Sequence, residues 1–290
     1  RTAVRRGFEL LGSASVFVKP GETILLKPNW LAADPPEKAV TTHPVVFQAV
    51  AEVLLEAGVS LTYGDSPGFQ STETAAKRTG VAAVADALQI PLADFRGSRE
   101  VHFAEGKQNK KFDIANAVFE SDRVTSLPKM KAHGFQRVTG AVKNQFGCIP
   151  GALKGEFHVK SPDAYDFTKM LIDLTAYIRP VLYTMDGIVA MEGNGPRGGD
   201  PRKMNVLLFS DDPIALDATM CRIMNLAPAL VLTNRAGMEM GLGSYLEEDI
   251  ELLGDPIASF IARDYRVNRE PDQPGNQKNR SGWIKTVITP

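Results

Sequence analysis

Short apolar segments that fit β-strands alternate with amphipathic segments that fit α-helices along this chain of 290 residues. The predicted strands are residues 22–27, 59–63, 122–127, 181–185, 204–209 and 250–253. The predicted helices are residues 44–57, 72–89, 162–178, 213–224 and 256–265. Because strands that alternate with helices usually pair in parallel, this order predicts an α/β fold: a mostly parallel sheet with helices on both faces.

Several helix boundaries are marked by residues that favour helix ends. Pro44 stands at the first position of one predicted helix, and Gly58 follows its last turn. Ser161 and Asp212 each stand directly before a proline, and we predict that they are the N-caps of the helices that follow them.

The domain organisation can also be read from the pattern. Residues 90–118 alternate weakly, which predicts short strands with a hairpin turn at Gly106 to Asn109. They would form a small β insertion, at about residues 90–120, within an α/β domain that covers residues 1–267. Residues 268–290 are rich in proline, glycine and asparagine, and are predicted to be a polar C-terminal tail.

Charge and cysteine content exclude several classes of function. The net charge is −1, so no general attraction to nucleic acid is expected, and the absence of a long apolar run predicts no membrane span. Cys148 and Cys221 are the only cysteines, too few for a disulfide framework or a four-cysteine iron–sulfur site. We therefore expect a cytoplasmic location, although a chain that begins with Arg1 leaves export open.

Polar residues follow the carboxyl ends of five predicted strands. They are Lys27 and Asn29, Asp65 and Ser66, Lys129 and Lys131, Asp186, and Asp211 and Asp212. In open α/β sheets, ligands bind outside the carboxyl ends of the strands. The pattern therefore predicts one shared crevice, with ordinary polar loops as the alternative.

Residues 140–151 form the most informative segment of the sequence, and basic residues flank it on both sides. Four lysines and two histidines, separated by glycines, stand within thirty residues: Lys129, Lys131, His133, Lys143, Lys154 and His158. Lysines bind phosphate or carboxylate groups, and histidines exchange protons near neutral pH. We predict a site for a small anionic ligand here; a solvated basic loop is the alternative.

Individual roles follow from the residue types. The predicted catalytic residues are Asp65, His133, Lys143 and His158. The predicted ligand-binding residues are Lys27, Asn29, His43, Ser66, Lys129, Lys131, Asn144, Lys154, Glu192 and Asn194. The aromatic residues Trp30, Phe135 and Phe146 lie near these motifs, where they would either wall an apolar pocket or belong to the core.

A divalent metal is a further expectation, with Asp65, Asp186 and Glu192 as candidate ligands. No compact ligand spacing supports it, and aspartates at such positions are also typical of turns.

Cys148 lies in a glycine-rich turn near lysines, where it would be either a reactive nucleophile or, as we favour, a small buried thiol. Cys221 falls on an apolar helix and is predicted to be structural.

Two apparent motifs are excluded by their surroundings. Residues 193–198 match the G-x-G-x-x-G pattern, but Pro196 removes a backbone donor and a predicted strand follows where a dinucleotide site needs a helix. We predict instead a loop that covers a ligand, with Glu192 and Arg197. The chain contains no Walker A or G-x-S-x-G motif, so nucleoside triphosphatase and serine hydrolase activities are not expected.

Taken in order, the motifs between about residues 20 and 225 resemble those of the DUF362 family. They are Lys27-Pro-Asn29, Thr42-His43-Pro44, Gly64-Asp65-Ser66-Pro67-Gly68, Leu127-Pro-Lys129-Met-Lys131-Ala-His133, Val138-Thr139-Gly140-Ala-Val-Lys143-Asn144, Gly147-Cys148-Ile-Pro150-Gly151, Asp186-Gly187-Ile, Glu192-Gly193-Asn194-Gly195-Pro196 and Asp212-Pro213-Ile-Ala-Leu-Asp217. The resemblance implies no settled activity. Many family members resemble a fusion of this domain to a C-terminal ferredoxin-like domain with two four-iron clusters.

The C-terminal part of this chain departs from that pattern, because it contains no cysteine. We therefore expect no iron–sulfur cluster within the chain, and a separate ferredoxin-type protein is a candidate partner. Two functions fit the sequence. The first is an enzyme, with a homodimer left open, that binds a small anionic metabolite for isomerisation, redox chemistry or group transfer. The second is a non-catalytic binding domain for a ferredoxin-type electron carrier.

Overall fold

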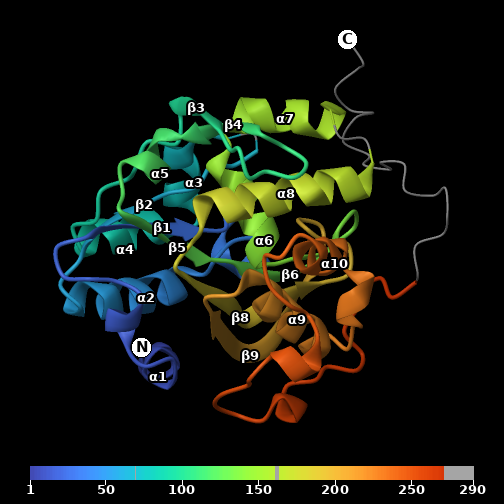
Figure 1. Ribbon diagram of the computed structural model, residues 1–290. Coiled ribbons are helices and arrows are strands. Elements are labelled where there is room, and N and C mark those ends of the chain that lie inside the picture. The colour runs from blue at the N-terminus through green and yellow to red at the C-terminus, as the bar shows by residue number, and fades with distance from the viewer. Residues whose placement is uncertain (69, 161–162, 271–290) are drawn as a thin grey trace.

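A seven-stranded sheet forms the centre of the computed structural model, which describes residues 1–68, 70–160 and 163–270, except the side chains of residues 152 and 158–160 (Figure 1). Its strands are β1 (Thr23–Pro28), β2 (Ser60–Tyr63), β5 (Arg123–Leu127), β6 (Lys129–His133), β7 (Arg137–Thr139), β8 (Leu182–Glu192) and β9 (Asp200–Ser210). β1 pairs in parallel with β2 and β5, and β8 pairs in parallel with β5 and β6. β7 and β9 add antiparallel pairings, so the sheet is mostly parallel, as predicted.

The long strand β8 joins the two halves of this sheet. Its first half pairs with β5, and its second half pairs with β6, where Lys129 lies opposite Asp186. Pro128 separates β5 from β6, and its carbonyl oxygen accepts the N–H of Asp186 at 2.8 Å. Lys129 and Lys131 therefore lie within the sheet itself, whereas the sequence pattern placed them beyond the end of a strand.

Helices cover both faces of the sheet, which confirms the predicted layering (Figure 1). One face carries α1 (Thr2–Leu10), α2 (Pro44–Glu56), α3 (Thr72–Arg78) and α4 (Val81–Ala87), and the other carries α6 (Ala141–Asn144), α8 (Ala164–Ile178), α9 (Pro213–Ile223) and α10 (Leu232–Glu239). Successive residues of a strand point to opposite faces. Accordingly, Ile24 and Leu26 pack in the core with α2, whereas Leu25 packs in the core with α8.

A separate two-stranded antiparallel sheet confirms the expected small β element. It consists of β3 (Ser98–His102) and β4 (Lys111–Ala115). Its turn is held by the buried carboxylate of Asp173, which accepts the backbone N–H groups of Lys107, Gln108 and Asn109 at 2.7 to 2.9 Å. The short helix α5 (Asn116–Phe119) follows β4. The helix α7 (Gly151–Lys160) packs against β4 through the stacked rings of Phe157 and Phe112.

The starts of two helices were predicted correctly, and that of a third was predicted wrongly. α2 begins at Pro44, and the carboxylate of Asp212 accepts the N–H groups of Ile214 and Ala215 at the start of α9. The N-cap of α8, however, is Asp163. Its carboxylate can accept two N–H groups of the first turn, so the helix begins later than the sequence predicted. Residues 161 and 162, the predicted cap and first residue, lie outside the described residues.

The region after α10 differs most from the prediction. Residues 250–253 form no strand, and within residues 256–265 the only helical element is a single 3₁₀ turn, Ile257–Ser259. Both segments lack a pairing strand or a continuous apolar face, and the chain is instead attached by Tyr265, whose buried hydroxyl donates to the carbonyl oxygen of Met191 at 2.7 Å. The predicted tail from residue 271 onward lies outside the described residues. None of the described helices is both long and apolar enough to cross a lipid bilayer.

Candidate functional site

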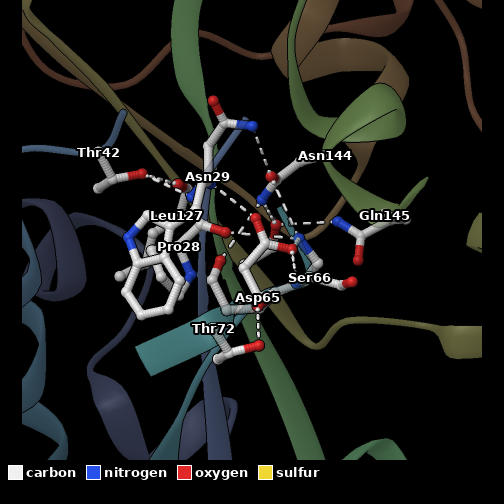
Figure 2. A network of polar contacts seen from close by, with 12 residues as sticks. Pro28, Asn29, Thr42, Asp65, Ser66, Thr72, Leu127, Asn144 and Gln145 are labelled. Carbon is white, nitrogen blue, oxygen red and sulfur yellow. Dashed lines mark hydrogen bonds and ion pairs between the residues drawn. The ribbon is translucent and has the colours of Figure 1, made fainter. Parts of the chain in front are cut away.

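The carboxyl ends of β1 and β2 bring a buried ion pair together. Lys27 is the fifth residue of β1, and its Nζ lies 2.9 Å from Oδ1 of Asp65, which follows β2 by two residues. The other carboxylate oxygen of Asp65 accepts the N–H of Trp30 at 2.6 Å, and Oδ1 also accepts the N–H of Ser66 at 2.9 Å (Figure 2). Both oxygens of Asp65 are therefore engaged, and its role here is to hold the β1 and β2 loops together.

Gly147 allows another segment to approach this pair closely. A Cβ atom at this position would lie 1.8 Å from Oδ1 of Asp65 and 2.7 Å from Nζ of Lys27, distances that no side chain can occupy. The carbonyl oxygen of Gly147 in turn accepts the N–H of Ser66 at 3.2 Å. The glycine of the Gly-Cys-Ile-Pro-Gly motif is therefore required by close packing against the ion pair.

Asn144, at the end of α6, connects the ion pair to the middle of the sheet. Its Oδ1 accepts from Nδ2 of Asn29 at 3.1 Å and from Nζ of Lys27 at 3.3 Å, and its Nδ2 donates to Oγ of Ser126 at 2.9 Å. Gln145 donates to the same hydroxyl at 2.9 Å (Figure 2). The amide side chains thus orient one another between β1, β5 and α6.

Ser126, Gln145 and Thr42 belong to this network although sequence reasoning missed them. Thr42 accepts the N–H of Asn29 at 2.8 Å and donates to the carbonyl oxygen of Leu127 at 2.6 Å (Figure 2). Ser126 lies inside a predicted strand, where alternate residues face the core, so its position gave no signal. Thr42 belongs to the Thr42-His43-Pro44 motif and Gln145 follows the motif that ends at Asn144, and this placement was the only available signal.

A second buried ion pair lies between β6 and β8. Nζ of Lys129 lies 2.6 Å from Oδ2 of Asp186, which also accepts the N–H of His43 at 2.9 Å. Oδ1 of Asp186 accepts the N–H of Ile188 at 3.1 Å. The imidazole of His43 caps α2, because its Nδ1 accepts the N–H of Val45 at 3.2 Å, and burial lowers the pKa of this histidine.

Three further lysines of the site form no ion pair with a carboxylate among the described residues. Lys131 is buried, and its Nζ donates to Oδ1 of Asn29 at 2.7 Å and to the carbonyl oxygen of Val40 at 2.8 Å. Lys154, from α7, donates to the carbonyl oxygen of Ser66. Lys143, from α6, is half-buried and has no hydrogen bond or ion pair in the part of the chain that the structure describes.

Burial lowers the pKa of all three lysines, and the charge of Lys143 lowers it further in the other two. Burial lowers the pKa of Lys143 to about 8, and burial together with the nearby positive charges of Lys27 and Lys143 lowers the pKa of Lys154 to about 8. The pKa of Lys131 is lowered well below its usual value, first by burial and then by the charges of Lys143 and Lys129. The ammonium groups are therefore close enough to repel one another, and Lys143 takes part in both interactions.

The helix that carries Lys143 and Asn144 is fixed by Asp217 of α9. The carboxylate of Asp217 accepts the N–H of Ala141 at 2.6 Å and that of Val142 at 3.3 Å, which are free donors at the start of α6. A Cβ atom at Gly140 would lie 2.0 Å from Oδ1 of Asp217, so only glycine fits. Burial raises the pKa of Asp217 to about 7.

Other predicted site residues lie elsewhere. His133 ends β6, and its Nδ1 accepts the N–H groups of Phe135 and Gln136 at 3.0 and 3.1 Å in the turn to β7. Glu192 forms ion pairs with Arg202 at 2.9 Å and Arg266 at 3.0 Å.

In the described residues, Glu192 shares no hydrogen bond or ion pair with a lysine of the site. Asn194 is exposed in the turn between β8 and β9. The side chain of His158 lies outside the described part of the structure.

The candidate metal ligands are separated. Asp65, Asp186 and Glu192 each pair with a different basic side chain, and no group of three histidine, cysteine, aspartate or glutamate side chains suited to a metal occurs among the described residues.

Cys148 is fully buried and burial raises its pKa to about 12, which confirms the buried-thiol interpretation. Cys221 is likewise buried, with a raised pKa.

The turn at residues 193–198 connects β8 to β9, so the prediction that a strand, and not a helix, follows this motif is confirmed. Arg197, in this turn, forms an ion pair with Asp34 at 2.7 Å. Trp30 and Phe146 are buried among core residues, and Phe135 packs beside Phe167.

Comparison with known proteins gives one relative of high similarity. The thylakoid-associated protein sll1697 of Synechocystis sp. is 39% identical over 241 residues, which cover 83% of this chain and 74% of that protein. The solved lactate racemase apoprotein from Thermoanaerobacterium thermosaccharolyticum matches with a TM-score of 0.43 and 13% identity, over 70% of this chain and 51% of that one. A protein from Thermotoga maritima matches with a TM-score of 0.43 and 12% identity, over 71% and 54%.

This chain spans about half the length of both solved structures, and likeness at this level supports no statement on chemistry. The family described as "Domain of unknown function (DUF362)" matches residues 24–222, a range that includes every lysine of the site. The order of motifs in the sequence agrees with the range of this match. The chain belongs to the DUF362 family.

Proposed function

We propose that this protein is an enzyme that binds a small phosphate- or carboxylate-bearing metabolite at Lys143. The single observation that carries the proposal is the contrast among the lysines of the site. Lys27 and Lys129 are neutralised by aspartates at 2.9 and 2.6 Å, whereas Lys143 has no hydrogen bond or ion pair among the described residues. A half-buried ammonium group without a partner is costly, and a bound anion would offset that cost.

The chemistry of Lys143 supports an enzymatic role rather than binding alone. With a pKa of about 8, its amine can hold an anion when protonated and accept a proton when neutral, both near physiological pH. The helix that carries it is fixed by Asp217, and its neighbour Asn144 is fixed by Ser126. Such rigid placement is what a catalytic group needs. The proposal includes no metal, because each candidate carboxylate already has a basic partner.

Thermal unfolding in the presence of phosphorylated and carboxylated metabolites tests this proposal. A ligand at about 100 times its dissociation constant should raise the melting temperature of the wild-type protein by about 5 °C. Lys143→Met should remove that rise. Lys203→Met is the matched control, because Lys203 is an exposed lysine of β9, and it should leave the rise unchanged. An equal rise in the Lys143→Met variant would refute the assignment.

The location and the partner remain proposals. Two buried, unpaired cysteines are consistent with a cytoplasmic protein, whereas the relative from Synechocystis is named for its association with thylakoids. Fractionation of cells that express the full chain would separate these locations. The ferredoxin-type partner stays a prediction, for which a pull-down with a reduced ferredoxin is the direct test.

A further inference from the structure

The site contains more lysines than the aspartates that form ion pairs with them. Five lysines converge where β1, β6, α6 and α7 meet, and two aspartates form ion pairs with them. The lysines are Lys27, Lys129, Lys131, Lys143 and Lys154; the aspartates are Asp65 and Asp186. Three ammonium groups are left without a carboxylate within ion-pair distance in the described residues.

The remaining contacts of these three lysines are with neutral oxygen atoms. Lys131 donates to an amide and a carbonyl oxygen, Lys154 donates to a carbonyl oxygen, and Lys143 donates to no atom in the part of the chain that the structure describes. Such contacts satisfy N–H donors, but they do not cancel a net charge. Burial lowers the pKa of all three lysines, and for Lys131 and Lys154 the charges of neighbouring lysines lower it further, because a group that is repelled by nearby cations releases its proton more readily.

From this imbalance we infer that the ligand of the site is a small dianion, a phosphate-bearing or dicarboxylate compound, held by Lys131, Lys143 and Lys154. This inference rests on the proposed function, since it names the class of ligand for the same site. When all three amines are protonated, a monoanion would leave two of the three positive charges uncompensated. A phosphate group carries about 1.5 to 2 negative charges at pH 7, and a dicarboxylate carries two, so either would cancel most of the excess.

Lysine is also the residue type that suits this ligand. Its ammonium group acts as a point charge that approaches an oxyanion from any direction, and three of them can surround separate oxygen atoms. Binding of a dianion would raise the lowered pKa of Lys143 and Lys154 again, because an opposite charge favours the protonated amine. Complex formation above about pH 8 should therefore take up protons from the buffer.

Calorimetric titration with inorganic phosphate, malonate and acetate at equal ionic strength tests the inference on the full chain. We expect phosphate or malonate to bind at least about tenfold more tightly than acetate near pH 7. Lys154→Met should weaken the better dianion about tenfold while the affinity for acetate changes less. Preference for phosphate over malonate would assign a phosphate-bearing ligand, and the reverse would assign a dicarboxylate.

The two proposals fail in different ways. If acetate binds as tightly as both dianions, and Lys143→Met abolishes its binding, the anion site stands but the dianion inference is wrong. If no anion binds the wild-type protein more tightly than it binds Lys143→Met, the proposed function is wrong as well. Above pH 8, equal heats in buffers of different ionisation enthalpy would contradict the predicted proton uptake.

Discussion

At the scale of single residues, Lys143 imposes a cost on the folded protein. Its pKa of about 8 lies below the usual value of 10.5, which means that the folded state binds this proton more weakly than the unfolded state does. The resulting loss of folding stability is complete below about pH 8 and disappears above about pH 10.5. Residues that destabilise a fold are retained where they serve a function, and Lys143 fits that description.

Lys143→Met should therefore stabilise the protein without ligand, by about 1–2 kcal/mol at pH 7 once partial exposure is allowed for. The gain should shrink as the pH rises from 8 to 10. Urea unfolding at pH 7 and pH 10 measures this gain in the free energy of unfolding. Lys203→Met is the control, and its free energy of unfolding should change little at either pH. Destabilisation by Lys143→Met at pH 7 would mean that this lysine has a structural partner.

Gly147→Ala tests the close packing against the Lys27–Asp65 pair. A methyl group there would meet Asp65 at 1.8 Å, so we expect a loss of about 2–4 kcal/mol in the free energy of unfolding. Gly155→Ala is the matched control, because a Cβ at Gly155 in α7 meets no atom within 4 Å. Alanine favours helix there, so this variant should be neutral or slightly stabilising. Equal effects of the two substitutions would contradict the packing account.

At the scale of secondary-structure elements, the α6–α9 contact positions the site. Asp217 accepts two N–H groups at the start of α6, and burial raises its pKa to about 7. Between its usual pKa near 3.8 and pH 7, the folded state binds this proton more strongly than the unfolded state. The contribution of Asp217 to stability must therefore decrease as the pH rises through that range.

Comparison of wild type with Asp217→Asn at pH 5 and pH 8 tests this assignment. Asparagine cannot titrate, so the variant should gain stability relative to wild type on going from pH 5 to pH 8, by about 1–3 kcal/mol. Asp211→Asn is a suitable control, because Asp211 is exposed at the end of β9. If the difference in the free energy of unfolding between wild type and Asp217→Asn stayed constant with pH, Asp217 would be ionised alike in the folded and the unfolded state, which would contradict the assignment.

Elements with strong local signals were predictable, and those defined by tertiary contacts were not. α2 and α9 carry both an apolar period and a capping residue, and both were predicted correctly. β6 was missed because its two lysines are polar residues inside the sheet, neutralised or hydrogen-bonded by partners that are distant in sequence. α10 and the region after it also depend on contacts with distant segments, which a local pattern does not record.

At the scale of the whole molecule, the parallel sheet explains why the lysine site could be foreseen and its pairing could not. The carboxyl ends of β1 and β2 carry Lys27 and Asp65 to one place, as the fold rule predicts. Which lysine would meet which carboxylate depended on the register of β6 against β8, and on the contact between α6 and β5. Hence the unpaired state of Lys143 emerged only from the structure.

The pKa of Lys143 is the most direct test of this account. Acetylation by acetic anhydride follows the neutral amine, so labelling rates measured against pH, and mapped by peptide mass spectrometry, report it for each lysine. We predict a midpoint near pH 8 for Lys143, and we expect inorganic phosphate to slow the labelling of Lys143 but not that of the exposed Lys203. A midpoint for Lys143 at its usual value of 10.5, with no effect of phosphate on its labelling, would contradict the central claim that Lys143 binds an anion.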